Sequence, residues 1–358
     1  MTAPAPEGSS EWLDQAAALL EAWFSKNARP LPWRKDRSPY AVLVSETMLQ
    51  QTRIETVLGY FERFMKRFPD VAALASAPQD EVLKLWEGLG YYSRAWNLQK
   101  AAQVCMQEYG GSIPQTAAEL KKLPGVGDYT AGAVASIAFG EAVPAVDGNV
   151  LRILARLLAD ERSIMDKSVR REAAERLTAV LRTRPHPGRF NEALMELGEL
   201  ICLPGRPLCR RCPISDYCRA LAAGTEQDLP NRGEMKPRRK EEKTVLILCC
   251  KGKVALEKRP QKGLLAGLYG FPMLDGYWEE GEIRSWLMSY GVPLSGTERL
   301  ADAIHVFTHV EWHMRGWRIH SREALPDYIY ADSNELESRY ALPSAFRAYK
   351  NDCFPVGE

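Results

Sequence analysis

From Glu11 to about Leu221, apolar residues recur at three- and four-residue intervals, which is the spacing of amphipathic helices. Strand-like alternation is scarce in this part of the chain, and Pro and Gly mark short turns. The expected helices cover Trp12–Lys26, Pro39–Phe68, Asp80–Leu89, Ser93–Tyr109, Asp128–Phe139, Gly148–Ala159, Lys167–Arg182 and Phe190–Ile201. The pattern therefore predicts a helical domain over residues 11–225.

The pattern changes after residues 226–243, a stretch that is dense in charge and poor in apolar residues. Such a stretch predicts an exposed linker, with a long surface loop inside one domain as the alternative. The alternation beyond it predicts an α+β domain over residues 244–350. Its expected elements are strands over Thr244–Cys250, Val254–Lys258, Ile304–Thr308 and His309–His320, and helices over Glu280–Tyr290 and Pro343–Tyr349.

The composition agrees with two domains, because 358 residues exceed the usual size of one core and 46 % of them are hydrophobic. The longest apolar runs, such as Ala131–Ala138, are too short and too rich in small residues to span a bilayer. The N-terminus shows no basic start followed by an apolar core. We therefore expect a soluble, intracellular protein with no membrane partner.

The net charge is only +1, with 47 Lys and Arg against 46 Asp and Glu. Overall charge therefore does not identify a protein that binds polyanions. Any contact with nucleic acid must use local basic clusters.

Four of the eight cysteines lie close together, at Cys202, Cys209, Cys212 and Cys218. Their spacing is C-x6-C-x2-C-x5-C, and four thiolates this close can enclose a [4Fe–4S] cluster or a zinc ion. A site of four thiolates suits both metals, so the spacing alone leaves the choice open.

Gly125 and Gly127 stand between two expected helices, where glycine lets the backbone approach a ligand closely. The N–H groups of this turn and of the helix that follows can hold a phosphate without reading bases. A tight turn with no ligand is the plainer alternative.

Two carboxylates stand in contrasting surroundings. Ser38 is the expected N-cap and Pro39 the first residue of a helix in which Glu46 shares an apolar face with Val42, Leu43, Leu49 and Gln50. Desolvation there would raise the pKa of Glu46, as a general acid requires, unless the side chain reaches the helix edge or pairs with an Arg.

Asp147 precedes a helix, where it is expected to act as an N-cap. Amide donors and the helix dipole at this position favour the ionised carboxylate, which could stabilise a sugar cation. One protonated and one ionised carboxylate is the pairing used to cleave glycosidic bonds.

Together these features resemble the helix–hairpin–helix DNA glycosylase superfamily and, more closely, the MutY-type adenine DNA glycosylases. The resemblance extends from about Glu11 to Tyr349. The sequence motifs on which the resemblance rests are Leu31–Arg34, Ser45–Thr52, Gly88–Arg94, Leu123–Gly132, Val146–Val150 and the four cysteines.

The resemblance implies a mainly α helix–hairpin–helix glycosylase domain with a [4Fe–4S] loop, followed by an α+β Nudix-like domain. The helix–hairpin–helix would cover residues 121–139 and the iron–sulfur loop residues 202–218. The implied protein is a monofunctional adenine DNA glycosylase of base excision repair, which flips adenine out of double-stranded DNA and leaves an abasic site. The adenine would be mispaired with 8-oxoguanine or guanine. We expect a monomer associated with DNA, in the cytoplasm or nucleoid if the source is bacterial.

The resemblance also implies a role for individual residues. Glu46 would protonate N7 of the adenine and later help to activate water, while Asp147 would stabilise the sugar cation with support from Tyr129 and Asn149. The residues implied to bind the substrate are Trp33, Arg34 and Glu192 around the adenine, Gln51 and Tyr91 as wedges beside the oxidised guanine, and Leu89, Gly125 and Gly127 on the DNA. The cysteines would ligate iron, a choice that comes from the family.

The second domain resembles the Nudix fold, but the candidate helix at Glu282–Leu287 lacks the Arg-Glu and Glu-Glu pairs that hold magnesium. The resemblance therefore implies a domain that binds, through Phe307, Thr308 and His309, the oxidised guanine. Relatives usually have Ser in place of Thr308, and the hydroxyl is kept. The chain also departs at Tyr269 and Gly270, where relatives usually have Trp and Glu.

Two other functions stay open. A bifunctional glycosylase and lyase acting on oxidised pyrimidines needs a lysine amine where this chain has Tyr129. A mismatch-binding protein without catalysis would show the same clamp, cysteines and second domain, and only Glu46 and Asp147 argue against it.

Overall fold

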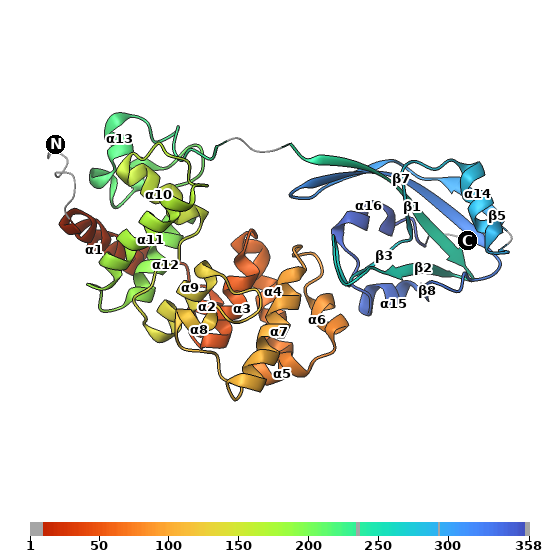
Figure 1. Ribbon diagram of the computed structural model, residues 1–358, viewed down its shortest axis with the longest axis horizontal. Helices are drawn as coiled ribbons and strands as arrows, with labels where there is room; N and C mark the ends of the chain where they lie inside the picture. The colour runs from red at the N-terminus through yellow and green to blue at the C-terminus, as the bar shows by residue number, and fades with distance from the viewer. Residues whose placement is uncertain (1–9, 234–236, 293, 355–358) are drawn as a thin grey trace. The chain divides into compact units, whose positions relative to one another are not determined.

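The computed structural model describes residues 10–233, 237–292 and 294–354. It divides into two compact units (Figure 1). Of the described residues, the helical unit comprises 10–76 and 97–233, and the sheet unit comprises 77–96, 237–292 and 294–354. Among the helices that the structure describes, none has the length and apolar character needed to cross a membrane.

The regular elements of the helical unit are all helices in the part of the chain described, as the apolar spacing predicts. They are α1 (Ser10–Asn27), α2 (Pro32–Lys35), α3 (Pro39–Leu49), α4 (Ile54–Arg67), α5 (Val71–Ser76), α7 (Ser93–Glu108), α8 (Ala117–Leu120), α9 (Asp128–Phe139), α10 (Gly148–Leu158), α11 (Lys167–Leu181), α12 (Pro187–Leu200) and α13 (Arg219–Ala223), with short 3-10 turns η1 (Cys209–Arg211) and η2 (Ser215–Tyr217). The short helices α2, α5 and α8 were not predicted, because four to six residues carry too little periodicity.

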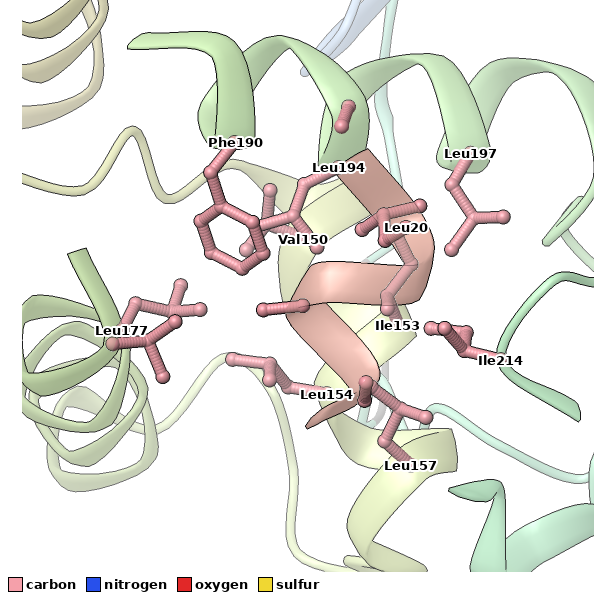
Figure 2. Close-up of a cluster of buried hydrophobic side chains, with 14 of the residues drawn as sticks. Leu20, Val150, Ile153, Leu154, Leu157, Leu177, Phe190, Leu194, Leu197 and Ile214 are labelled. Carbon is pink, nitrogen blue, oxygen red and sulfur yellow. The ribbon is translucent and has the colours of Figure 1, made fainter. Parts of the chain in front are cut away.

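A core beneath α10 and α12 holds one end of the helical unit together (Figure 2). The side chains of α10 that enter it are each at most 5 % exposed, and Val150, Ile153, Leu154 and Leu157 among them follow the three- and four-residue spacing. Burial of one such aliphatic side chain is worth about 1.5–3 kcal/mol. The residues labelled in Figure 2 are Leu20, Val150, Ile153, Leu154, Leu157, Leu177, Phe190, Leu194, Leu197 and Ile214.

The helix expected over Pro39–Phe68 is wrong, because the structure has two helices there, α3 and α4. The chain turns at Gln51, whose φ of 57° is left-handed and incompatible with a continuing α-helix. No Gly or Pro marks this turn. The face of α3 that carries Glu46 is buried, as expected, and burial extends to the other faces, since every residue from Tyr40 to Met48 is buried.

The sheet unit is built on a mixed sheet. Its strands are β1 (Arg239–Cys250), β2 (Lys253–Lys258), β3 (Tyr269–Gly270), β4 (Met273–Asp275), β5 (Leu294–Arg299), β6 (Ala303–Val306), β7 (Val310–Ser321) and β8 (Ile329–Ala331). The strand order is β3-β2-β1-β7-β5, with β4 on β1, β6 on β7 and β8 on β2. The helices of this unit are α6 (Gln79–Leu85), α14 (Glu280–Ser289), α15 (Ser333–Ser338), α16 (Arg347–Lys350) and the 3-10 turn η3 (Ser344–Phe346).

Strands β1 and β7 pair in parallel along their length, and β1 is buried on both faces from Thr244 to Leu248. Val245 and Ile247 point into one core cluster, while Leu246 and Leu248 point into another that includes α14. Burial on both faces explains the continuous apolar run in this strand. The expected strands at Thr244–Cys250 and Val254–Lys258 form an antiparallel hairpin, β1 and β2, and Lys251 and Gly252 at its tip have φ of 49° and 74°, as a type I′ turn requires.

The exposed linker is shorter than expected. Strand β1 begins at Arg239, inside residues 226–243, where its charged first residues pair with β7 from Val310 onward. At the other end of the stretch Leu229 is only 5 % exposed, and its carbonyl accepts a hydrogen bond of 3.0 Å from Nε of Arg156. Charge alone therefore overstated the linker, because charged side chains can line a half-exposed strand.

Candidate active site

Glu46 lies in the middle of α3 with only 4 % of its surface exposed. The helix starts where the sequence predicts, since Ser38 caps it by accepting a hydrogen bond from the Ala41 N–H, and Pro39 follows. The hydroxyl of Tyr129 donates a hydrogen bond of 2.7 Å to Oε2 of Glu46. Burial raises the pKa of Glu46 to about 7, although this hydrogen bond lowers it. The carboxyl group can therefore carry a proton near neutral pH.

Asp147 is the N-cap of α10, as expected. Its Oδ1 accepts a hydrogen bond of 2.8 Å from the Val150 N–H, and its Oδ2 accepts one of 3.1 Å from Nδ2 of Asn149. Burial nevertheless raises the pKa of Asp147 above 3.8, while these donors and Arg152 lower it. The cap thus supplies the expected amide donors, which favour the ionised form, while burial of the site acts in the opposite direction and raises the pKa.

The two acids line the same cavity, whose volume is about 90 Å³. The predicted site residues that share this lining are Trp33, Arg34, Glu46, Tyr129, Asp147, Asn149 and Glu192. The cavity is formed by α2, α3, α9, α10 and α12, so segments more than 100 residues apart supply its walls. Trp33 is buried and packs edge-on against Phe61, with ring centroids 5.3 Å apart.

Two buried carboxylates on α12, Glu192 and Glu196, form ion pairs with the arginines beside the cavity. Arg34 Nε lies 3.4 Å from Oε1 of Glu192, and its Nη2 donates a hydrogen bond of 2.9 Å to Oε2 of Glu196. Arg37 contacts Glu192 at 2.9 Å, and Arg29 contacts Glu196 at 2.9 Å. Burial raises the pKa of Glu192 in spite of its arginines. Burial would also raise the pKa of Glu196, but Arg29 and Arg34 lower it to about 2.

Sequence analysis did not single out Arg29, Arg37 or Glu196. Their partners lie more than 150 residues away along the chain, so no local pattern pairs them. One signal was present, since Glu192 and Glu196 stand four residues apart on a helix and therefore on one face.

Asn149 also connects the acids to the cysteine loop. Its Oδ1 accepts a hydrogen bond of 2.9 Å from Nη1 of Arg152, a side chain that is almost fully buried. Nε of Arg152 donates a hydrogen bond of 2.8 Å to the carbonyl of Cys202. The position of Asp147 is therefore fixed through two side chains to the first cysteine of the cluster motif.

A larger groove of about 1470 Å³ borders the cavity, and Tyr129, Asp147 and Asn149 line both. Basic side chains line this groove. Because the net charge of the chain is only +1, binding to nucleic acid would require such a local cluster. They are Arg53, Lys121, Arg152, Lys167, Arg170, Arg171 and Arg232.

Gly125 and Gly127 line the same groove at the start of α9. Gly125 has a φ of 75°, and a Cβ at this position would lie 2.5 Å from Cβ of Asn97, so only glycine fits. Gly127 is the N-cap of α9 and offers no side chain to its first N–H groups. These N–H groups are free of a side-chain cap and suit an anionic ligand.

The two residues expected to act as wedges share an unusual backbone conformation. Gln51 in the helical unit and Tyr91 in the sheet unit have φ of 57° and 47°, and both are exposed. They are two of the five non-glycine residues with positive φ in the described chain. Such conformations cluster at ligand-binding positions because the surrounding structure must enforce them. Leu89, by contrast, is only 6 % exposed.

The loop between β6 and β7 carries the other predicted residues. Phe307 packs edge-on against Trp312, at 4.9 Å between centroids, and its carbonyl accepts a hydrogen bond from Arg238. Thr308 and His309 are exposed. The hydroxyl groups of Thr308 and Tyr91 lie 3.2 Å apart, within hydrogen-bonding distance.

The departures at Tyr269 and Gly270 have a local explanation. The hydroxyl of Tyr269 donates a hydrogen bond of 3.0 Å to Asp80, and Nζ of Lys258 lies 5.0 Å from the ring centroid. A Cβ on Gly270 would lie 2.6 Å from the Phe346 ring, so a larger residue would displace that ring.

The four predicted metal ligands lie in one region around η1 and η2. Burial, together with the neighbouring thiols Cys202, Cys218 and Cys209, raises the pKa of Cys212 to about 12. Among the residues that the structure describes, no three or more His, Cys, Asp or Glu side chains are arranged so that they could bind a metal ion.

An uncompensated cation stands beside these thiols. Arg156 is 2 % exposed, and its Nη1 lies 3.3 Å from Sγ of Cys202. Its Nη2 has no hydrogen-bond partner in the described part of the chain. A buried guanidinium facing sulfur atoms favours thiolates or another anionic group at this position.

Residues 44–179 match the family of HhH-GPD superfamily base excision DNA repair proteins, and residues 244–351 match the NUDIX domain. The chain is similar to the adenine DNA glycosylase of Homo sapiens, with 38 % identity over 82 % of this chain and 64 % of the human protein. It is also similar to the adenine DNA glycosylase of Buchnera aphidicola (strain Bp), with 34 % identity over 82 % of each protein. The chain thus spans less than two thirds of the human relative.

Two solved structures resemble the helical part. A thermostable thymine-DNA glycosylase superposes with a TM-score of 0.54 and 27 % identity, over 60 % of this chain and 98 % of that one. A trapped endonuclease III–DNA covalent intermediate superposes with a TM-score of 0.51 and 25 % identity, over 61 % and 99 %.

Proposed function

Since this chain belongs to the adenine DNA glycosylase family, we propose that it hydrolyses the bond between adenine and deoxyribose in DNA, as a monofunctional enzyme of base excision repair. Its substrate is double-stranded DNA in which adenine lies opposite 8-oxoguanine or guanine, and it acts as a monomer. The product is an abasic site. The observation that carries this proposal is the shared cavity of Glu46 and Asp147.

The adenine leaves the duplex and enters this cavity. Glu46 is the general acid that protonates N7 of the base, and the hydroxyl of Tyr129 orients its carboxyl group. Asp147 accepts hydrogen bonds from two amide groups, whereas Glu46 accepts one from a phenol. The donors around Asp147 favour its ionised form, so the proton of the pair stays on Glu46 and Asp147 stabilises the sugar cation.

Lysine chemistry is disfavoured at this centre. A lyase forms a Schiff base between a lysine amine and the sugar. No lysine among residues 10–233 lines the cavity, and Lys121 pairs with Asp128 at 2.9 Å on the surface. This arrangement supports hydrolysis without strand cleavage.

The four cysteines are the ligands of a [4Fe–4S] cluster in this proposal. Such a cluster supplies a rigid anchor for the surrounding loop and, in general, a redox centre. The buried Arg156 fits an anionic group held by thiolates.

The sheet unit reads the base opposite the adenine. The side chains of α14 that could have held magnesium are engaged elsewhere, since Glu279 and Glu282 form a capping box and Glu280 pairs with Arg284 at 2.6 Å. The exposed hydroxyl of Thr308 is the group that contacts the oxidised guanine.

The deciding experiment compares wild type with Glu46→Gln on a duplex containing adenine opposite 8-oxoguanine. We expect the variant to lose base release while it keeps DNA binding, because only the transferable proton is lost. Glu175→Gln is the matched control, since Glu175 is exposed on α11. A wild-type protein that binds the duplex and frees no adenine would favour the non-catalytic alternative.

A further inference from the structure

The turn that leads into α7 presents one exposed aromatic side chain in a strained conformation. Gly88, Gly90 and Tyr91 have φ of 99°, 71° and 47°. In a tyrosine this conformation brings Cβ close to the following carbonyl oxygen. The ring of Tyr91 is 48 % exposed, so burial of the ring does not explain why the strain is kept.

The guanidinium group of Arg94 donates hydrogen bonds to the backbone of this turn. Its Nη2 donates hydrogen bonds of 3.2 and 3.1 Å to the carbonyls of Leu89 and Gly90, and its Nε reaches the carbonyl of Tyr91 at 3.4 Å. The side chain is only 7 % exposed. One planar guanidinium thus fixes three successive peptide groups, which a lysine ammonium on its flexible stem cannot do in the same way.

The same guanidinium lies between two aromatic rings. Its Cζ is 5.4 Å from the ring centroid of Trp86 and 5.5 Å from that of Tyr91. Trp86 adds a hydrogen bond of 3.2 Å from Nε1 to the Gly90 carbonyl. Tyr91 is therefore fixed through its backbone and through its ring.

We propose that Arg94 is a positioning residue that holds Tyr91 ready to enter the DNA base stack. This inference rests on the proposed function. A rigid aromatic ring that is already oriented stacks on a base at a low entropic cost, whereas a mobile ring must first be ordered.

The test is a double-mutant cycle with Arg94→Lys and Tyr91→Ala, measured as single-turnover adenine release from DNA with adenine opposite 8-oxoguanine. We expect Arg94→Lys to slow release by about tenfold, equivalent to ~1.4 kcal/mol. In the Tyr91→Ala background the same substitution should change the rate less than about twofold, because the positioned ring is already gone. Equal losses in both backgrounds would overturn the inference.

A readout independent of base release separates this inference from the proposed function. A 2-aminopurine placed beside the 8-oxoguanine reports unstacking by its fluorescence when protein binds. Arg94→Lys should reduce this signal as Tyr91→Ala does, whether or not adenine is released. Arg339→Lys is the control, since Arg339 also stacks on a tyrosine, Tyr340, and is exposed elsewhere in the sheet unit. An unchanged signal in Arg94→Lys would refute positioning even if the glycosylase is active.

Discussion

Tyr129 and Glu46 are 83 residues apart in the chain, yet the phenol of one donates a hydrogen bond of 2.7 Å to the carboxyl group of the other. The bond opposes burial, which raises the pKa of Glu46 to about 7. The chemistry of the centre depends on this balance, because a general acid works best with a pKa near the working pH.

The first prediction concerns pH. Adenine release in single turnover should fall as the pH rises through about 7, because Glu46 then loses its proton. In Tyr129→Phe the midpoint should move to higher pH, since the hydrogen bond that lowers the pKa is removed. Tyr40→Phe is the control, because Tyr40 is also buried and bonds the Phe68 carbonyl. A midpoint that stays in place in Tyr129→Phe would contradict the assignment.

The second prediction concerns stability. The pKa of Glu46 is higher in the folded protein, at about 7, than its ordinary value of 4.5. Its contribution to stability is therefore complete below pH 4.5 and is lost as the pH rises through 7. The Glu46→Gln variant has no carboxyl group at this position and so does not lose this stability. The difference in free energy of unfolding, variant minus wild type, should therefore increase by about 2 kcal/mol between pH 5 and pH 8. Urea titrations at the two pH values measure the gain, and parallel pH dependences would exclude a raised pKa.

Local signals predicted the two acids and their elements. Asp147 precedes a helix as a capping residue should, and Ser38 and Pro39 mark the start of the helix that carries Glu46. The hairpin at Lys251 was equally predictable, because a two-residue turn with Gly follows from local backbone preferences.

Other parts of the site depend on contacts that no local pattern encodes. The break at Gln51 has no Gly or Pro, and the left-handed turn is imposed by tertiary structure. The pairing of Arg29 with Glu196 joins residues 167 positions apart. The raised pKa of Asp147 follows from burial in the folded protein, which its capping position does not reveal, whereas the lowering effect of the cap donors follows from the helix terminus.

The third prediction concerns the buried ion pairs of Glu196 with Arg29 and Arg34. Glu196 is almost fully buried between Arg29 and Arg34, so Glu196→Gln should leave buried charge uncompensated and cost about 3–5 kcal/mol of unfolding free energy at pH 7. The pKa of Glu196 is lowered to about 2, so the pair stabilises the fold above pH 4.5 and this stability is lost as the pH falls towards 2. The difference between wild type and variant should therefore shrink in acid.

Glu175→Gln is the control for Glu196→Gln, because the ion pair of Glu175 with Arg171, at 3.6 Å, lies on the surface. It should change the unfolding free energy by less than about 1 kcal/mol. Equal effects of the two substitutions would show that the buried pair is worth no more than an exposed one.

The fourth prediction concerns the cofactor. Protein purified without oxygen should show broad visible absorbance and contain iron, and Cys212→Ser should lose both. Cys105→Ser is the matched control, since Cys105 is buried in α7, outside the cysteine motif, and should keep the spectrum. A colourless wild type containing one zinc ion would overturn the iron–sulfur proposal.

The last prediction concerns the base opposite the adenine. Thr308→Val keeps the branched shape of the side chain and removes its hydroxyl, which lies within 3.2 Å of the Tyr91 hydroxyl. A hydrogen bond to 8-oxoguanine is worth about 1 kcal/mol, so the preference for 8-oxoguanine over guanine in single-turnover adenine release should fall about fivefold. Thr308→Ser keeps the hydroxyl and should keep the preference. If Thr308→Val instead slows release equally on both duplexes, the hydroxyl supports the loop or Tyr91 and does not read the base.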